Sequence, residues 1–424
     1  MRSYAIIGFG TAGYHAAKAI RETDAEAEIY VYSHTGEGPY NPMLTTYHVS
    51  GKLSYQAMFP FGTLEEIKKE LRLCVISHKV LRLWALEHRV ETEDGISRQY
   101  DKILVSSGAS AIAPKVEGLE QKNYFLMRTN EDAVRLRSRL EAGDVRSAVV
   151  VGASMVGIKV VELLSERGIQ TTLADLAPYM FPTAAYEEVA HEIEKRLRSR
   201  GIRLCFENTV VYMEKERNLP MARLTKGECV PADIVVMCIG TRPNLSFLDS
   251  KEIRINRGLV VNEQMETTVP GIYGAGDCCE GWDLEGRETR IIGLWANANH
   301  QGTIAGNSMT GGTRRFSGNI LHNITHFMGM DFIGFGDTRI QGQVLTSGRL
   351  GSGLYIKAVC RGNEIVGVNI LDHYRVSGIV KNYMLRLLQG GGNELTSFQK
   401  KMLLHAGMDR KFIEELEETV SGAD

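Results

Sequence analysis

The sequence predicts an α/β protein in which helices cover parallel sheets, and three observations support this fold class. Short apolar, β-branched runs alternate with segments of helical periodicity over residues 1–315. Two of these runs, residues 4–7 and 148–151, lead directly into glycine-rich turns at the start of a helix. From about residue 316 the pattern changes to strands with glycine turns, followed by helices. Such alternation is typical of sheets that are buried on both faces.

Length and composition set the number of domains and the kind of partner. At 424 residues the chain exceeds one ordinary core, so we expect two or three domains. The formal charge of −2 gives no support for nucleic acid or an anionic membrane as the main partner. No apolar run approaches the roughly 18 residues that span a bilayer, and the first residues lack a signal-peptide pattern. Seven cysteines without Cys-x-x-Cys spacing argue against a disulfide framework and a metal site, so we expect a cytoplasmic protein.

The first glycine-rich turn has the pattern of a dinucleotide site. Gly8, Gly10 and Gly13 have G-x-G-x-x-G spacing after a strand and at the start of a helix. The first glycine permits a tight turn, the second lets a pyrophosphate approach the backbone, and the third lets helix and strand pack closely. The helix amino end, at Thr11 and Ala12, offers free N–H groups to phosphate.

This first site departs from the usual pattern at one position. An acid that bonds a ribose hydroxyl is expected after the strand 28–32, and the sequence has Ser33 there. The Ser33 hydroxyl, a water molecule or the nearby Glu37 carboxylate are the alternatives for this bond. A turn that serves only packing is the alternative to cofactor binding.

The second glycine-rich turn, residues 152–159, reads Gly-Ala-Ser-Met-Val-Gly-Ile-Lys. It keeps the turn glycine and the packing glycine, and the small Ser154 stands at the middle position. The next strand ends in Asp175, at the spacing of an acid that bonds an adenosine ribose, and no arginine follows before Arg196. We therefore expect NADH rather than NADPH, and a degenerate domain kept for packing is the alternative. The residues expected at this site are Gly152, Ser154, Met155, Val156, Gly157 and Asp175.

Several further segments carry a resemblance to a known family. Residues 267–277, Thr-Thr-Val-Pro-Gly-Ile-Tyr-Gly-Ala-Gly-Asp, end a strand with a small-residue turn and an aspartate. Residues 294–302 read Leu-Trp-Ala-Asn-Ala-Asn-His-Gln-Gly, and segments 100–108 and 233–244 are strands that end in glycine turns. Together with the two fingerprints, the sequence resembles the two-dinucleotide flavoprotein disulfide reductase superfamily. The strongest likeness is to its NADH oxidases, rubredoxin and ferredoxin reductases, and the flavin part of assimilatory nitrite reductases.

The resemblance implies a domain arrangement. We expect two Rossmann-like domains, one for FAD over residues 1–115 and 247–315 and one for NAD over 116–246. A carboxy-terminal α/β domain over 316–424 resembles the dimerisation domain of the family, so we expect a homodimer.

The resemblance also implies roles for particular residues. Asp277 is expected to hydrogen-bond the FAD ribityl chain, and the helix that begins near Trp295 and Ala296 is expected to face the flavin pyrimidine. A helix amino terminus there would favour the anion of reduced flavin. Further glycines expected at the two cofactor sites are Gly108, Gly240 and Gly276.

Three positions of the family pattern have changed, and two of them are the two halves of an expected ion pair. The family has Tyr-x-Arg-Pro-x-Leu-Ser-Lys, whose lysine pairs beside flavin N5 with a glutamate of the NAD domain. Here Asn41 stands before Pro42 in place of the arginine, and Thr46 stands in place of the lysine. Lys159 stands in place of the glutamate. We expect Lys159 to supply the positive charge near N5 from the opposite wall, and the alternative is that it extends along the helix to solvent.

The absence of a suitably placed cysteine indicates the class of reaction. Disulfide reductases need a redox cysteine against the flavin, and neither 42–46 nor 148–159 contains one. Cys278 and Cys279 follow the FAD-binding aspartate, where core packing is the favoured interpretation and a redox role the alternative.

The resemblance therefore implies an FAD-dependent NADH:acceptor oxidoreductase, in which a hydride passes from NADH to flavin N5 without a cysteine relay. The acceptor is open: an iron–sulfur or rubredoxin-type protein, dioxygen, a quinone or a small organic substrate. The alternative is a non-catalytic FAD-binding redox sensor or a structural subunit of an electron-transfer complex.

Overall fold

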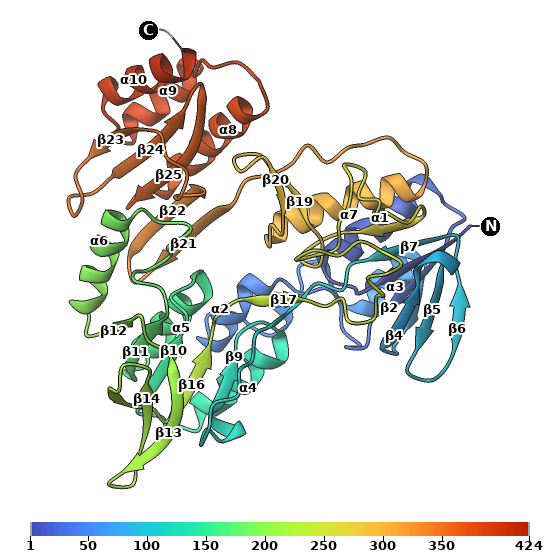
Figure 1. Ribbon diagram of the computed structural model, residues 1–424, viewed down its shortest axis with the longest axis horizontal. Coiled ribbons are helices and arrows are strands. Elements are labelled where there is room, and N and C mark those ends of the chain that lie inside the picture. The colour runs from blue at the N-terminus through green and yellow to red at the C-terminus, as the bar shows by residue number, and fades with distance from the viewer. Residues whose placement is uncertain (1, 423–424) are drawn as a thin grey trace.

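The computed structural model describes residues 2–422 and arranges them around three five-stranded sheets (Figure 1). The predicted fold class is confirmed: two parallel, Rossmann-like sheets are followed by a carboxy-terminal α/β domain. The sheets lie within the predicted ranges 1–115 with 247–315, 116–246 and 316–424, and the domain boundaries themselves stay a prediction. None of the helices in residues 2–422 is both long and apolar enough to cross a membrane.

The first sheet, blue in Figure 1, draws its edge strand from much later in the chain. Its strands pair in parallel, and the central ones are buried, as short apolar runs between helices predict. The helices α1 (Thr11–Thr23) and α7 (Trp295–Met309) lie side by side against it (Figure 1). The strands in spatial order are β18 (Ile272–Gly274), β7 (Lys102–Val105), β1 (Ser3–Ile7), β2 (Glu28–Tyr32) and β3 (Leu73–Ile76).

The second sheet, green in Figure 1, repeats this arrangement in the middle of the chain. Its central strand β10 (Ser147–Val151) is buried at every residue, because helices cover one face of the sheet and a small antiparallel sheet covers the other. The helices are α4 (Asn130–Glu141), α5 (Met155–Glu166) and α6 (Glu187–Arg198). The other strands are β12 (Arg203–Phe206), β11 (Gln170–Asp175), β16 (Ile234–Met237) and β9 (Tyr124–Leu126). A small antiparallel sheet adds β13 (Val210–Glu216), β14 (Leu219–Leu224) and β15 (Cys229–Pro231).

The third sheet is antiparallel and forms the carboxy-terminal domain, orange to red in Figure 1. One face packs on the helices α8 (Ser377–Leu388), α9 (Ser397–His405) and α10 (Arg410–Ser421). Its strands in spatial order are β21 (His322–Phe327), β22 (Met330–Gly336), β25 (Glu364–Leu371), β24 (Tyr355–Arg361) and β23 (Gln343–Gly348).

The carboxy-terminal domain shares a hydrophobic core with the second sheet. The Phe181 ring stacks on Phe332 with 5.2 Å between ring centroids, and Phe327 and Met330 are buried in the same cluster. A buried hydrogen bond adds to this packing: Asn369 Oδ1 accepts the Tyr186 N–H at 2.8 Å. The second sheet with its helices and the carboxy-terminal domain are therefore joined by both apolar and polar groups.

Small residues let α1 and α7 approach closely. A Cβ at Gly302 would lie 2.2 Å from the Ala12 carbonyl oxygen, and one at Gly306 would lie 2.4 Å from the Ala16 carbonyl oxygen. Neither contact is possible for a real side chain, so both glycines are required by this helix pair. The close approach places the amino end of α7 beside the first glycine turn.

We predict that Gly306→Ala lowers the free energy of unfolding by about 1–3 kcal/mol, because the added methyl group forces the two helices apart. Thermal unfolding measures this change. Gly378→Ala in α8 is the matched control, since a Cβ there meets nothing within 4 Å. The control is expected to be neutral or slightly stabilising. Equal melting temperatures for the two variants would contradict the packing argument.

Candidate functional site

The first glycine turn has the geometry that an FAD pyrophosphate requires. Gly8 has φ +96°, and a Cβ there would lie 2.5 Å from the Ser106 carbonyl oxygen. A Cβ at Gly13 would meet the Gly8 carbonyl oxygen at 2.4 Å. The backbone at Gly10 instead faces open space, with nothing within 4 Å of an added Cβ. That space beside the free N–H groups of Thr11 and Ala12 suits a phosphate.

The structure places both side chains that are candidates for the ribose contact after β2. Ser33 is buried, with its hydroxyl 3.3 Å from that of Thr35. The Glu37 carboxylate is already engaged, because it accepts hydrogen bonds from the Tyr55 hydroxyl at 2.5 Å and from the Asn130 amide. Glu37 therefore ties the segment after β2 to the start of α4, and the ribose contact by Ser33, a water molecule or Glu37 stays a prediction.

The second turn shows why a serine is tolerated at its middle position. The Ser154 hydroxyl accepts the Gly157 N–H at 3.2 Å and donates to the Cys238 carbonyl oxygen at 3.0 Å. The side chain is thus turned inward as the amino-terminal cap of α5 and leaves the outer side of the turn free. Gly157 is obligatory, since a Cβ there would lie 1.9 Å from the Gly152 carbonyl oxygen.

Asp175 lies where a ribose-bonding acid is needed. It ends β11, and its carboxylate accepts the Ala153 N–H at 2.5 Å and the Ala177 N–H at 2.7 Å. The acid is therefore fixed beside the second glycine turn. Apolar side chains near it are open to solvent: Leu176 is 67% exposed and Val156 is 40% exposed. This surface suits the NAD site that Asp175 predicted.

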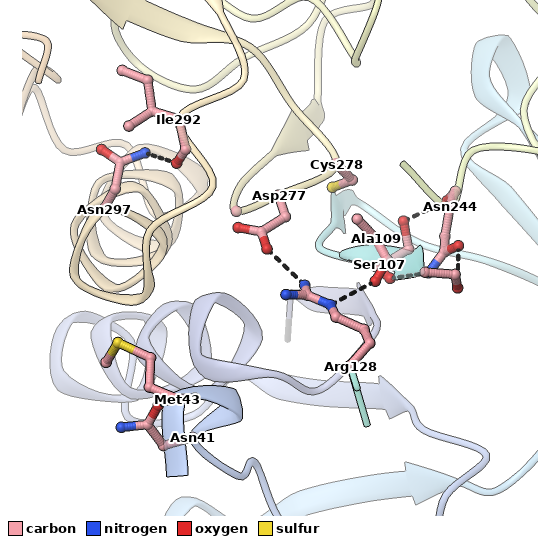
Figure 2. Close-up of polar contacts among 12 residues, drawn as sticks. Asn41, Met43, Ser107, Ala109, Arg128, Asn244, Asp277, Cys278, Ile292 and Asn297 are labelled. Carbon is pink, nitrogen blue, oxygen red and sulfur yellow. Dashed lines mark hydrogen bonds and ion pairs between the residues drawn. The ribbon is translucent and has the colours of Figure 1, made fainter. Parts of the chain in front are cut away.

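An ion pair joins the end of β18 in the first sheet to the start of α4 beside the second sheet (Figure 2). The Asp277 carboxylate, which follows β18, accepts a hydrogen bond at 2.7 Å from Nη2 of Arg128, which precedes α4. Arg128 Nε donates to the Ala109 carbonyl oxygen at 3.0 Å. The two charged side chains are 24% and 17% exposed. Our sequence reasoning did not identify Arg128, because it lies outside every short motif.

Two short strands cross between the parallel sheets. They are β8 (Ala109–Ala111) and β17 (Thr241–Pro243), which follow Gly108 and Gly240 and pair in antiparallel fashion. The Ser107 hydroxyl donates to the Asn244 carbonyl oxygen at 2.6 Å, and the Asn244 N–H donates to the Gly108 oxygen at 2.9 Å (Figure 2). The predicted glycines therefore lie at the connection between the two nucleotide sites.

The amino end of α7 points its free N–H groups at the same region. Asn297 Nδ2 donates to the Ile292 carbonyl oxygen at 3.0 Å and fixes the entry into the helix (Figure 2). Trp295 opens the helix beside Ala296, and its ring lies parallel to Phe61 with 5.8 Å between centroids. Further along α7, Gln301 Oε1 accepts the Gly276 N–H at 2.9 Å and so ties the helix to the turn before Asp277. The helix dipole and N–H groups there suit an anionic ring edge.

The changed segment 41–46 is held by local bonds. The Asn41 side chain accepts the Met43 N–H at 3.0 Å and caps the short helix Pro42–Leu44 (Figure 2). Thr46 is buried in α2 (Thr45–Val49). Asn41 therefore serves as a cap where the family has an arginine.

Lys159 is held inside the protein, in contrast to the solvent-exposed alternative. Its side chain is 15% exposed, and its ammonium forms an ion pair with Glu162. The same ammonium donates to the His326 carbonyl oxygen at 2.8 Å and lies 5.0 Å from the Tyr47 ring centroid. Its charge is thus balanced by Glu162, a partner that sequence reasoning missed. A role for Lys159 or Thr46 beside the flavin stays a prediction.

The adjacent cysteines are part of the core. Cys278 and Cys279 are 0% and 1% exposed. Burial raises the pKa of both thiols, so the reactive thiolate form is disfavoured. These observations support the packing interpretation.

Comparison with known proteins agrees with this geometry. Residues 2–302 match the family described as pyridine nucleotide-disulphide oxidoreductase. The chain is similar to subunit epsilon of the NADH-dependent phenylglyoxylate dehydrogenase of Aromatoleum evansii, with 28% identity over 90% of this chain and 91% of that protein. It is also similar to the rubredoxin-NAD(+) reductase of Ectopseudomonas oleovorans, with 29% identity over 64% of this chain and 71% of that protein.

The fold is that of solved flavoproteins. The water-forming NADH oxidase from Lactobacillus brevis, bound to NADH, superposes with a TM-score of 0.87 at 21% identity and covers 100% of this chain and 98% of its own. The predicted cofactors, FAD and NADH, are those of the matched family. As the resemblance predicted, the chain belongs to the pyridine nucleotide-disulphide oxidoreductase family and is an FAD-dependent NAD(P)H oxidoreductase.

Proposed function

We propose that this protein is an FAD-dependent NADH:acceptor oxidoreductase that passes electrons to a redox protein without a cysteine relay. The observation that carries the proposal is the pair of glycine turns at the starts of α1 and α5, with Asp175 fixed beside the second turn, on two sheets joined by Arg128 and Asp277. No cysteine lies in the segments 42–46 and 148–159 that line the two sites.

Each group has a distinct task in this proposal. The turn at Gly8–Gly13 and the amino end of α1 bind the FAD pyrophosphate, and Asp277 bonds the ribityl chain. The amino end of α7 stabilises negative charge on the flavin pyrimidine. The turn at 152–157 and Asp175 bind NADH. When bound, FAD supplies the chemistry of hydride acceptance from NADH and onward electron transfer.

The nature of the acceptor is supported by the names of the relatives. One relative is a subunit of a dehydrogenase complex, and another is named for reduction of rubredoxin, so both operate with a protein partner. A small iron–sulfur or rubredoxin-type protein is accordingly the acceptor we favour over dioxygen, a quinone or a small organic substrate. We further propose that residues 316–424 form the interface of a homodimer.

We predict that NADH reduces the bound flavin. Under argon, NADH should rapidly bleach the flavin absorption band, because both glycine turns leave free helix N–H groups for a pyrophosphate and Asp175 is fixed beside the second turn. Adding in turn a small iron–sulfur protein, rubredoxin, dioxygen and a quinone to the reduced protein then identifies the acceptor by the rate of reoxidation. A flavin spectrum that does not change with NADH would instead support a non-catalytic sensor or a structural subunit.

We predict that Asp175→Asn weakens the preference for NADH over NADPH. A 2′-phosphate about 4 Å from a carboxylate is disfavoured by roughly 1–4 kcal/mol, so removing the charge should change the ratio of the two reduction rates about tenfold or more. Asp233→Asn is the matched control, because Asp233 also accepts two backbone N–H groups, at 2.8 Å each, in the same domain. An unchanged ratio in Asp175→Asn would show that the acid is not beside the ribose.

We predict that Arg128→Met weakens FAD binding. The substitution removes the charged hydrogen bond to Asp277, an interaction worth about 1.5–3 kcal/mol. The bond is present without FAD, so only the part of this energy that fixes Asp277 for binding is lost from the affinity. The dissociation constant for FAD, measured by flavin fluorescence on reconstitution of apoprotein, should therefore rise by up to about tenfold. Arg139→Met in α4 removes the Arg139–Asp144 surface ion pair and is expected to leave FAD binding unchanged. Equal FAD affinity in the two variants would contradict the role of Arg128.

A further inference from the structure

The strand β21 is an edge strand, with β22 as its one neighbour in the carboxy-terminal sheet. Edge strands leave backbone groups on their outer side without strand partners. The His326 carbonyl is such a group near the end of β21, and Met328 begins the tight turn to β22 with φ +48°. Side chains of α5 bond both the His326 carbonyl and the Met328 N–H.

The two side chains on α5 act together. Lys159 Nζ donates to the His326 carbonyl oxygen at 2.8 Å, and Glu162 Oε1 accepts the Met328 N–H at 2.6 Å. Lys159 and Glu162 also pair with each other, and their side chains are 15% and 10% exposed. The ion pair therefore attaches the end of β21 and the turn that follows it to α5.

The Lys159 ammonium also contacts α2, on the flavin side of the protein. It lies 5.0 Å from the ring centroid of Tyr47, which is in α2 next to Thr46. At this range a lysine ammonium is attracted to the ring face. The Lys159–Glu162 pair of α5 thus contacts two other elements: the end of β21 in the carboxy-terminal sheet, and α2, which begins in the segment 41–46.

We propose that Glu162 is a positioning residue for NADH oxidation: through Lys159 it fixes α5 against α2 and so sets the distance between the two dinucleotide sites. This inference rests on the proposed function. Hydride transfer is sensitive to such positioning, because a misplacement of about 1 Å can cost on the order of a hundredfold in rate. Lys159→Glu would lose this ion pair and put two carboxylates on one helix face.

Glu162→Gln in the FAD-bound protein tests the proposal. The glutamine still accepts the Met328 N–H, but it no longer carries the charge that holds Lys159. Stopped-flow mixing with NADH under argon should show a limiting rate of flavin reduction that is lower on the order of tenfold to a hundredfold. The apparent dissociation constant for NADH, the FAD content and the melting temperature should change little. In a double-mutant cycle with Lys159→Met, the double variant should be no slower than the slower single variant.

The pair Lys52–Glu166 provides the matched control. It also joins the segment after α2 to α5, at 2.8 Å, but its side chains are 50% and 45% exposed. Glu166→Gln should therefore leave the limiting rate within about twofold of wild type. Equal rates in Glu162→Gln and Glu166→Gln, or a slow rate that appears only with loss of FAD, would overturn the proposal.

A second measurement separates this inference from the proposed function. If NADH does not reduce the wild-type flavin, the proposed function fails and so does the part of the inference that concerns rate. Amide hydrogen exchange over residues 322–330 then tests the attachment itself. Faster exchange in Glu162→Ala, which removes the acceptor of the Met328 N–H, than in Glu166→Ala would support it, and equal protection in both variants would refute it.

Discussion

The structure depends on the close approach of backbone to backbone at the two glycine turns. At Gly157 even a methyl group would lie 1.9 Å from the Gly152 carbonyl oxygen, and at Gly8 it would lie 2.5 Å from the Ser106 oxygen. These approaches let α1 and α5 start directly at the carboxyl ends of their sheets. Free helix N–H groups then face the crevice in which dinucleotides bind in open α/β sheets. Every cofactor contact discussed above follows from these two starting points.

The relative position of the FAD and NAD sites depends on a small number of polar contacts between the domains that carry them. Arg128 with Asp277, Glu37 with Asn130, and the crossing strands β8 and β17 link the FAD sheet to the NAD sheet. The carboxy-terminal domain is joined to the NAD sheet by a shared core as well. Since polar contacts between domains are individually modest, a single change can alter the geometry of the site without unfolding either sheet.

The fold and the two turns could be predicted because their signals are local. Glycine spacing, an apolar strand before it and an acid at the end of the next strand are read along the chain, as with Gly152 and Asp175. Arg128 could not be found in this way, because its partner lies 149 residues away. Glu162 has the i, i+3 spacing of a helix neighbour of Lys159, so this pair could have been read from the sequence, whereas its bond to Met328, 166 residues away, could not. The tolerance for Ser154 was expected from its size, but its inward hydrogen bond to Cys238 needed the structure.

The central claim is that electrons pass between NADH and the acceptor through the flavin alone. An anaerobic titration of the FAD-bound protein with dithionite tests it most directly, because a thiol–disulfide pair is a two-electron couple in addition to the flavin. The account predicts complete reduction by two electrons per FAD. Uptake of four electrons per FAD, with thiols appearing as the flavin is reduced, would contradict it.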